Sequence, residues 1–506
     1  MVEKKQKDLA LGAVILTAFS FLSKFLGMWF RLYLTSRIGS EGIGLYQVIM
    51  SVYTLFATFA TAGFSVCVSR LAAERMEGNA MTGDSRNALW RCLSLSLIIA
   101  VFSMVILLFA SEYIAASILA DERAGVPISI LAISMVFIGP CACLKGYFLA
   151  EGKAWKNATA MIFEQLVKIS VSVFLFSRVL TDATDPGSLC LGIVWGTTVG
   201  EAASFFYCLF IFLFSRRQGS VKKHGATNYR SIIRLIIPLA FGSYVTTLLH
   251  TGESVLIPRC FELFGGDRAE SLAAFGVIRG MTIPLLFFPF SFVSSFVSLL
   301  IPRVTKYRAD GNEATLKKVV EKTLSATWVF SIAVSSIFFV FAKEIAVLFY
   351  HSEECVSSLR LLALINPMMY VETVSGGLLN GIGEQNFTLR CNLYNSVLRI
   401  TAIATLIPRL GVWGYLMILI VSNAFTFMLC YARILKKTRA RVRLFRSVIF
   451  PTAVSLGVGW LVYFSAHSLG ELLSCIIGSC LVLIPSILYL GKDDFPFKRK
   501  RIDNGT

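Results

Sequence analysis

The chain of 506 residues is 56% hydrophobic and only 15% charged, and its formal net charge is +18. Soluble domains contain about 25% charged residues, so this composition excludes a soluble globular protein and predicts one that lies in a membrane. Because the basic excess is concentrated in loops, as membrane topology requires, it gives no reason to expect nucleic-acid binding.

Apolar runs long enough to cross a bilayer, about 20 residues each, recur along the whole chain. They predict an all-α polytopic membrane protein with about fourteen transmembrane helices. The expected spans are 9–36, 42–69, 88–110, 126–150, 157–179, 188–214, 230–260, 270–302, 319–342, 358–380, 387–408, 411–433, 447–466 and 470–490. Pro238 in the seventh span and Pro284 and Pro289 in the eighth are expected kink sites, because proline interrupts helical hydrogen bonding.

Basic residues alternate between dense and sparse loops, and the dense set orients the chain. The dense segments are the N-terminus, the loops near residues 70–86, 153–156, 216–223, 303–318 and 433–443, and the C-terminal tail. The positive-inside rule places this set in the cytoplasm. Both termini are therefore expected to be cytoplasmic.

The sequence contains an internal repeat. Residues 146–169 align without a gap to residues 377–400. The matched positions include Gly146 with Gly377, Gly152 with Gly383, and Lys168 with Arg399. Because an even number of predicted helices separates the copies, both have the same orientation, as in transporters built from two parallel halves. The repeat predicts two pseudo-symmetric six-helix lobes, residues 1–220 and 221–440, followed by an extra helix pair and a basic cytoplasmic tail in residues 441–506.

Charged residues inside the spans point to a polar cavity, because a charge at the centre of the bilayer costs about 2.5–3.5 kcal/mol. Lys24 and Arg31 lie two helical turns apart on the first span and so share one face. Two cations on one face suit a multiply charged anion such as a diphosphate, which Arg binds through paired hydrogen bonds and Lys as a point charge. The alternative is that the side chains extend to the membrane interfaces. Arg279 in the eighth span is a third embedded cation.

Other polar residues of the spans have either a structural or a functional role. Glu164 and Lys168 are four residues apart, in the order that favours an internal ion pair. His250 and Glu253 share a face of the seventh span, and Glu253 together with asparagine oxygens could bind a sodium ion or a proton. Packing explains His250 equally well. The candidates for a cavity or a coupling ion are Glu164, Lys168, His250, Glu253, Arg259, Asn392, Asn395 and Arg399.

The cysteines and the known motifs predict neither a metal site nor an enzyme. Cys141 and Cys143 should point to different sides of one helix, while a disulfide between Cys260 and Cys355 stays open. Walker A, zinc-protease and nucleophile-elbow motifs are absent from the sequence. Transport would therefore be driven by an ion gradient, the membrane potential or consumption of the product.

The first-span motif is SKFLGMWFRLYLTSRIGSEGIGLYQ, residues 23–47, and it resembles the start of the stage V sporulation protein B-like polysaccharide flippases. These belong, with the lipid II flippases, to the multidrug/oligosaccharidyl-lipid/polysaccharide superfamily. Residues 145–169 look like the family's fourth-to-fifth helix segment, and residues 278–303 are similar to the superfamily's eighth helix. The resemblance covers essentially the whole chain.

The resemblance implies a flippase of the bacterial cytoplasmic membrane that moves an undecaprenyl-diphosphate-linked oligosaccharide or peptidoglycan precursor by alternating access. Lys24, Arg31 and Arg279 match basic positions that bind the substrate diphosphate in relatives, and the extra helices 447–490 match a groove for the lipid tail. No cofactor is expected beyond coupling to Na⁺ or H⁺. The expected partners are the lipid-linked sugar and membrane lipids, and the expected state is a monomer. Residues 43–68 lack the charges of the lipid II flippases, which leaves lipid II open as the substrate.

Three other roles stay open at this point, one of which is a non-transporting scaffold that keeps the cavity without a cargo. A drug/cation antiporter of the same fold would need an acidic cavity, whereas the charges of the central spans are mostly basic. A membrane polysaccharide polymerase or glycosyltransferase would need catalytic groups in the outer loops, where the one candidate cluster is His351, Glu353 and Glu354.

Overall fold

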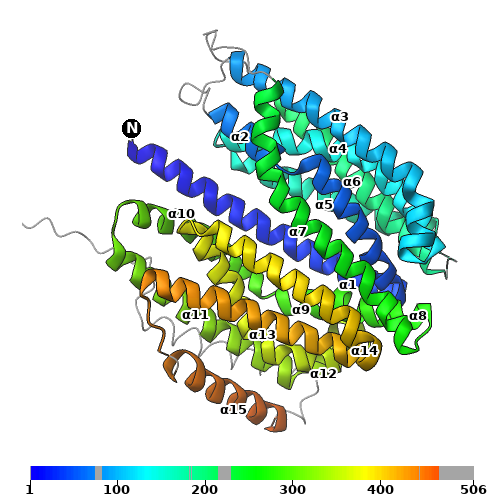
Figure 1. Ribbon diagram of the computed structural model, residues 1–506, viewed down its shortest axis with the longest axis vertical. Helices are drawn as coiled ribbons and strands as arrows, with labels where there is room; N and C mark the ends of the chain where they lie inside the picture. Colours follow the sequence, from blue (N-terminus) through cyan, green and yellow to red (C-terminus); the bar gives the residue numbers. More distant parts are fainter. Residues whose placement is uncertain are drawn as a thin grey trace, which may run out of the picture. The chain divides into compact units, whose positions relative to one another are not determined.

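The protein is helical throughout the part that the computed structural model describes, which comprises residues 2–73, 83–181, 183, 185–214, 229–443 and 445–465 (Figure 1). No strand occurs among these residues, so the all-α prediction is confirmed. The helices are α1 Val2–Thr61, α2 Phe64–Ala73, α3 Gly83–Tyr113, α4 Gly125–Ala150, α5 Ala154–Arg178, α6 Pro186–Phe214, α7 Tyr229–Phe264, α8 Arg268–Phe275, α9 Ile283–Phe287, α10 Phe290–Ala309, α11 Glu313–Val340, α12 Ala342–Tyr350, α13 Val356–Gly381, α14 Gln385–Thr438 and α15 Phe450–Ser465. π-helical turns span Ile114–Leu119, Gly276–Thr282 and Phe445–Ile449, and a 3₁₀ turn spans Glu122–Ala124.

Within the described ranges, eight helical runs are long and apolar enough to cross a membrane. A ninth consists of Tyr229–Pro238 and Ala240–Phe264, whose axes meet at 46° beside the predicted kink residue Pro238. Two of the eight runs have 52 and 54 residues. At 1.5 Å per residue each would be about 80 Å long, more than twice a hydrocarbon core. The count of about fourteen spans stays a prediction, and its last span, 470–490, lies outside the described residues.

Glycines interrupt both of these long runs where the sequence predicts a gap between spans. Gly39 in α1 has φ 68° and ψ −177°, and Gly411 in α14 has φ 55° and ψ −134°. Glycine adopts positive φ without the steric cost that a Cβ imposes. These positions separate the predicted spans 9–36 and 42–69 and begin the predicted span 411–433, so α1 and α14 each contain two of the predicted helices.

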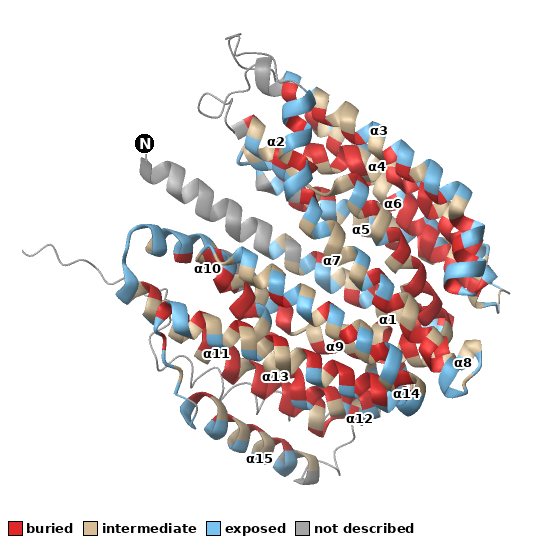
Figure 2. Cartoon of the chain, viewed as in Figure 1, coloured by how far each residue is buried: buried red, intermediate tan, exposed pale blue. Residues whose placement is uncertain are grey.

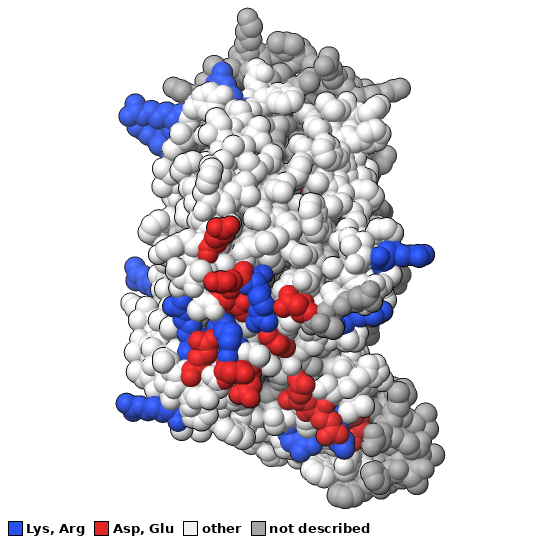
Figure 3. Space-filling model, turned by 90° about the vertical axis from the view of Figure 1, so that its right-hand side faces the viewer, with Lys and Arg blue, Asp and Glu red and all other residues white. Residues whose placement is uncertain are grey.

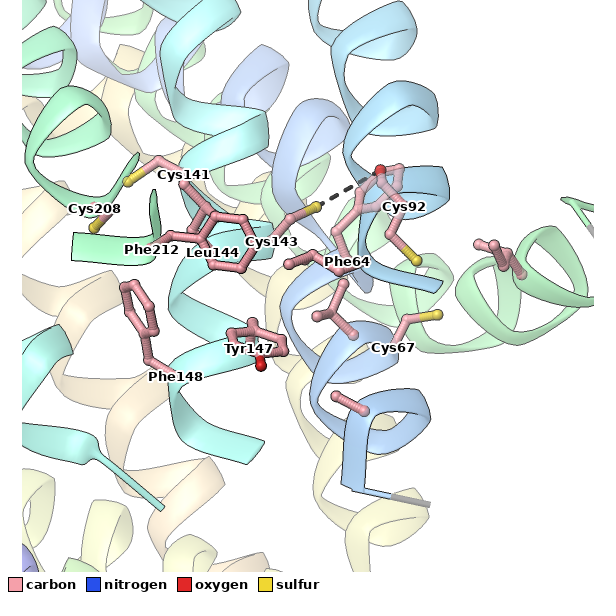
Figure 4. Packing of buried hydrophobic residues seen from close by; sticks show 14 of the residues in the cluster. Phe64, Cys67, Cys92, Cys141, Cys143, Leu144, Tyr147, Phe148, Cys208 and Phe212 are labelled. Atoms are coloured by element: carbon pink, nitrogen blue, oxygen red, sulfur yellow. Dashed lines mark hydrogen bonds between the residues drawn. The ribbon is translucent and has the colours of Figure 1, made fainter. Parts of the chain in front are cut away.

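The chain packs as two units, Met1–Gly280 and Met281–Thr506. In the first unit, buried side chains from α2, α3, α4, α6 and α7 form a core around Phe64, Tyr147, Phe148 and Phe212 (Figure 4). In the second unit, Trp328 of α11 and Tyr370 of α13 belong to a buried cluster with residues of α10 and α14. The division into two pseudo-symmetric lobes, residues 1–220 and 221–440, stays a prediction.

The cysteines of the first core behave as predicted. Cys141 Sγ lies 3.7 Å from Ser204 Oγ on α6, whereas Cys143 Sγ donates to the Cys92 carbonyl on α3 at 3.7 Å (Figure 4). The two thiols therefore point to different sides of α4. Cys260 of the first unit and Cys355 of the second are each buried as free cysteines. Across the described ranges, no cluster of three His, Cys, Asp or Glu side chains could hold a metal ion.

Equivalent glycines of the repeat have equivalent local structure. Gly152 follows α4 with φ 71°, and Gly383 follows α13 with φ 87°. A Cβ on Gly146 would lie 2.8 Å from the Cα of Ser65, on α2, so α4 packs closely against that helix. Gly377 of α13 similarly faces α10. This agreement supports the internal repeat.

The surface matches a lipid environment. Buried residues run along α4, α6 and α13, while large apolar side chains lie on exposed positions (Figure 2). Phe109, Phe214 and Leu461 are 88%, 73% and 70% exposed, which water would strongly disfavour. Charged side chains gather in patches and leave wide uncharged areas (Figure 3). The protein is a multi-pass membrane protein.

Candidate functional site

The first helix and the segment that carries Arg279 pack together in the first unit. Three glycines permit this close approach. A Cβ on Gly44 would lie 2.7 Å from the Leu272 carbonyl carbon, and one on Gly276 would lie 2.8 Å from the Gly44 nitrogen. Gly276 and Gly280 form a Gly-x-x-x-Gly pattern, the small-residue spacing that lets membrane helices approach each other. The backbone of α1 therefore meets the π-helical turn Gly276–Thr282 directly.

This packing brings two of the predicted cations onto neighbouring segments. Arg31 Nη1 donates a hydrogen bond to the carbonyl oxygen of Gly280 at 3.4 Å, although 249 residues separate the two. Gly280 directly follows Arg279, and both arginine side chains are partly exposed. Lys24 is exposed on α1, two turns before Arg31. The structure thus places Arg31 beside the segment that holds Arg279 and leaves Lys24 further along the same helix.

A second group of charges lies within the helices of the first unit. Lys145 Nζ of α4 and Glu164 Oε2 of α5 form an ion pair at 3.1 Å, with side chains 24% and 20% exposed. Of the two alternatives for Glu164, the internal pair with Lys168 is not the one formed, because a lysine from the adjacent helix reaches the carboxylate instead. Glu201 of α6 lies within electrostatic range of Glu164, Lys145 and Lys168. The group therefore contains two basic and two acidic side chains, drawn from α4, α5 and α6.

Close packing of α5 and α6 assembles this group. A Cβ on Gly200 would lie 3.1 Å from the Glu164 carbonyl oxygen and 3.2 Å from Lys168 Cβ. The absence of a side chain at Gly200 thus brings its neighbour Glu201 close to α5. Lys145 and Glu201 are not among the predicted site residues, yet both lie inside predicted spans, 126–150 and 188–214. Counting every charge in an apolar run would have found them.

The seventh helix holds the predicted His250 and Glu253 together. His250 Nδ1 lies 3.7 Å from Glu253 Oε2, with the imidazole about half exposed and the carboxylate buried. Thr251 Oγ1 donates to the Ser51 carbonyl at 3.0 Å and so fixes this part of α7 against α1. The shared face of His250 and Glu253 is confirmed. Arg259 lies apart from them and donates to the Ser117 carbonyl.

Arg259 lies near an ion network that the sequence does not reveal. Arg123 binds Asp121 and Glu41, each at 2.8 Å. Arg268 binds Glu262 at 2.5 Å and lies 3.7 Å from Asp121. These five residues join α1 just after its bend at Gly39, the connection between α3 and α4, and the junction of α7 with α8. The network links segments of the first predicted lobe to segments of the second within one packing unit.

In the second unit, the remaining predicted residues share one face of α14 by their spacing. Asn392 is exposed, Asn395 is half-buried and Arg399 is buried. Asn423, further along α14, donates from Nδ2 to the Leu419 carbonyl at 2.7 Å. The role of these residues in coupling an ion stays a prediction. In the connection between α12 and α13, Glu353 is exposed and pairs with Lys343 of α12 at 3.1 Å.

Comparison with known proteins identifies the family. Residues 9–307 match the polysaccharide biosynthesis protein family, and residues 265–404 match the MatE family. Stage V sporulation protein B of Bacillus subtilis (strain 168) is 23% identical over 443 residues, covering 84% of this chain and 83% of that protein. Lipid II flippase MurJ of the same strain is 22% identical over 519 residues, covering 95% and 94%.

Solved structures share the fold. Lipid II flippase MurJ in an inward closed conformation superimposes with a TM-score of 0.72 at 15% identity, covering 95% of this chain and 99% of that one. An inward-facing multidrug resistance MATE transporter of the MOP superfamily gives 0.64 at 17% identity, covering 85% and 100%. Because the family match spans more than half of the chain, the protein belongs to the polysaccharide biosynthesis protein family, as the resemblance of its first span indicates.

Proposed function

We propose that this protein is a flippase that moves an undecaprenyl-diphosphate-linked oligosaccharide or peptidoglycan precursor across the cytoplasmic membrane by alternating access. The observation that carries the proposal is the contact of Arg31 with the residue next to Arg279. It gathers cations from two distant segments, and cations are the groups that bind a diphosphate. The names of the relatives, which include a lipid II flippase, agree with it.

In this proposal Arg31 and Arg279 hold the diphosphate, and Lys24 adds a third positive charge two turns away. The sugar crosses with the diphosphate while the polyprenyl tail stays in lipid. Both termini lie in the cytoplasm, and transport requires no enzymatic step in this protein. Na⁺ or H⁺ coupling would involve the embedded carboxylates.

A flipping assay tests the proposal. The purified protein is reconstituted in liposomes with a fluorescent undecaprenyl-diphosphate glycolipid, and a membrane-impermeant quencher reports the lipid left outside. Lys24→Ala, Arg31→Ala and Arg279→Ala should each abolish flipping. Arg178→Ala removes an exposed cation at the end of α5 and serves as the matched control. Full activity of the Arg31 and Arg279 variants would refute the cationic site.

A drug/cation antiporter is the second candidate, because MATE transporters share the fold. The embedded carboxylates Glu164, Glu201 and Glu253 favour it, since organic cations need negative partners. Uptake of a fluorescent organic cation into the same liposomes distinguishes the two functions. Cation transport without glycolipid flipping would favour the antiporter.

A further inference from the structure

The second unit contains a cationic pocket that the proposed transport site does not use. Its volume is about 260 Å³. It lies where α10 ends, α11 begins and α14 ends, at the end of the unit that the positive-inside rule predicts to be cytoplasmic. The residues that line it are Arg308, Glu313, Leu316, Arg433, Lys436, Lys437, Thr438 and Arg439.

The pocket has a surplus of positive charge. Arg308 Nη1 lies 3.6 Å from Glu313 Oε1. Arg433 and Lys437 share a neighbouring carboxylate, Glu384, at 2.7 Å and 2.6 Å. Three cations of the lining are thus matched by two carboxylates.

The two other cations are available to a ligand. Lys436 and Arg439 are exposed, and within the described part of the chain neither has a carboxylate at ion-pair distance. The pocket and its rim therefore combine five cations with two carboxylates, a surplus of three positive charges.

The backbone also favours an anion here. Arg439 ends α14 in the left-handed region, with φ 52° and ψ 27°, which costs a residue with a Cβ about 1–2 kcal/mol. This conformation stops the helix and keeps Arg439 on the pocket wall. The N-terminus of α11, capped by the Asn312 side chain on Thr315 N–H at 3.1 Å, opens at the same place and adds the positive end of a helix dipole.

We propose that this pocket binds a phosphate-bearing anion, and that the head group of an anionic phospholipid of the cytoplasmic leaflet supplies it. A volume of about 260 Å³ lies below the roughly 300–1,000 Å³ of drug-sized ligand sites, so it fits a head group and not an oligosaccharide. Guanidinium and ammonium groups are the usual partners of phosphate, and basic pockets at the cytoplasmic side bind such head groups. A soluble phosphate compound has the same chemistry and is the alternative source.

Binding to full-length protein in nanodiscs tests the proposal. Native mass spectrometry counts phosphatidylglycerol retained against phosphatidylcholine, and inorganic phosphate and pyrophosphate are titrated separately. The test variant is Lys436→Gln with Arg439→Gln, which breaks no observed ion pair. The matched control is Lys306→Gln with Lys318→Gln, two exposed cations near the same end that do not line the pocket.

The test variant should retain phosphatidylglycerol about 30-fold more weakly, since each basic residue near a membrane surface contributes about a factor of five. The control should bind as wild type does. Glu313→Gln, which removes the carboxylate of the lining, should tighten binding about fivefold. If the test variant loses pyrophosphate binding but retains lipid as wild type does, the pocket is an anion site whose ligand is a soluble phosphate compound and not a lipid head group.

Two outcomes overturn the proposal. One is an equal loss in the test and control variants, because the effect would then belong to the basic surface in general. The other is wild-type protein that neither prefers phosphatidylglycerol nor binds phosphate or pyrophosphate.

Discussion

Gly44→Ala tests how the first helix positions the candidate cationic site. The added Cβ would lie 2.7 Å from the Leu272 carbonyl carbon and nearer still to its oxygen. Ordinary contact begins at 3.4 Å, so α1 and the residues before Gly276 must separate by at least 0.7 Å. The Arg31 hydrogen bond to Gly280, already 3.4 Å long, would not survive that shift.

Overpacking of this kind costs about 1–3 kcal/mol. For a unit of 280 residues the melting temperature should fall by roughly 2–5 °C. Glycolipid flipping should fall as well, because Arg31 and Arg279 lose their relative position. Gly27→Ala is the matched control on the same helix, since a Cβ there meets no atom within 4 Å. It replaces glycine with a better helix former and should be neutral or stabilising by up to about 1 kcal/mol.

Thermal unfolding in detergent and the flipping assay measure both variants side by side. If Gly44→Ala melts and transports like Gly27→Ala, the close approach of α1 to the Arg279 segment does not hold the site together. If Gly44→Ala is destabilised but still flips lipid at the wild-type rate, the packing is real and the functional reasoning is wrong.

Three further outcomes follow from the ion pairs and one thiol. Lys145→Ala should lower the melting temperature, because it leaves Glu164 without its cation. The double variant Lys145→Ala with Glu164→Ala should recover most of that loss. A double variant that melts no higher than Lys145→Ala would show that the two residues are not coupled. Hydrogen bonds from Lys437 and Arg433, both on α14, hold the pKa of Glu384 below its ordinary value. The ionised Glu384 therefore stabilises the folded protein above about pH 4.5, the ordinary pKa of a glutamate. This stabilisation is lost as the pH falls through the lowered pKa of the folded state. Glu384→Gln should therefore cost about 1 kcal/mol or less at pH 7, and this cost should shrink as the pH falls below the lowered pKa; a cost that does not change with pH would contradict the assignment. Burial raises the pKa of the Cys355 thiol to about 11. Maleimide should label it slowly in folded protein and quickly in detergent-denatured protein, with mass spectrometry of its peptide as the readout.

Local features of the sequence predicted much of the fold. The breaks at Gly39 and Gly411 and the bend beside Pro238 follow from short-range rules on glycine, proline and span length. The paired turns at Gly152 and Gly383 follow from the repeat. Each of these predictions requires only residues that are close in the sequence, or an alignment of the chain with itself.

Contacts between distant residues could not be predicted in the same way. The i,i+4 rule paired Glu164 with Lys168, but the carboxylate binds Lys145 on the adjacent helix. The network of Arg123 with Glu41 joins residues 82 apart, and no sequence pattern marks it. Helix packing decides such partners, because it determines which side chains from different helices reach one another.

The ion pair between Lys145 and Glu164 has a consequence for the insertion of the protein into the membrane. Its two charges lie on α4 and α5, which are consecutive in the chain, and each charge alone would be costly in lipid. The two helices are therefore expected to enter the bilayer as a pair, with the lysine and the carboxylate already in contact.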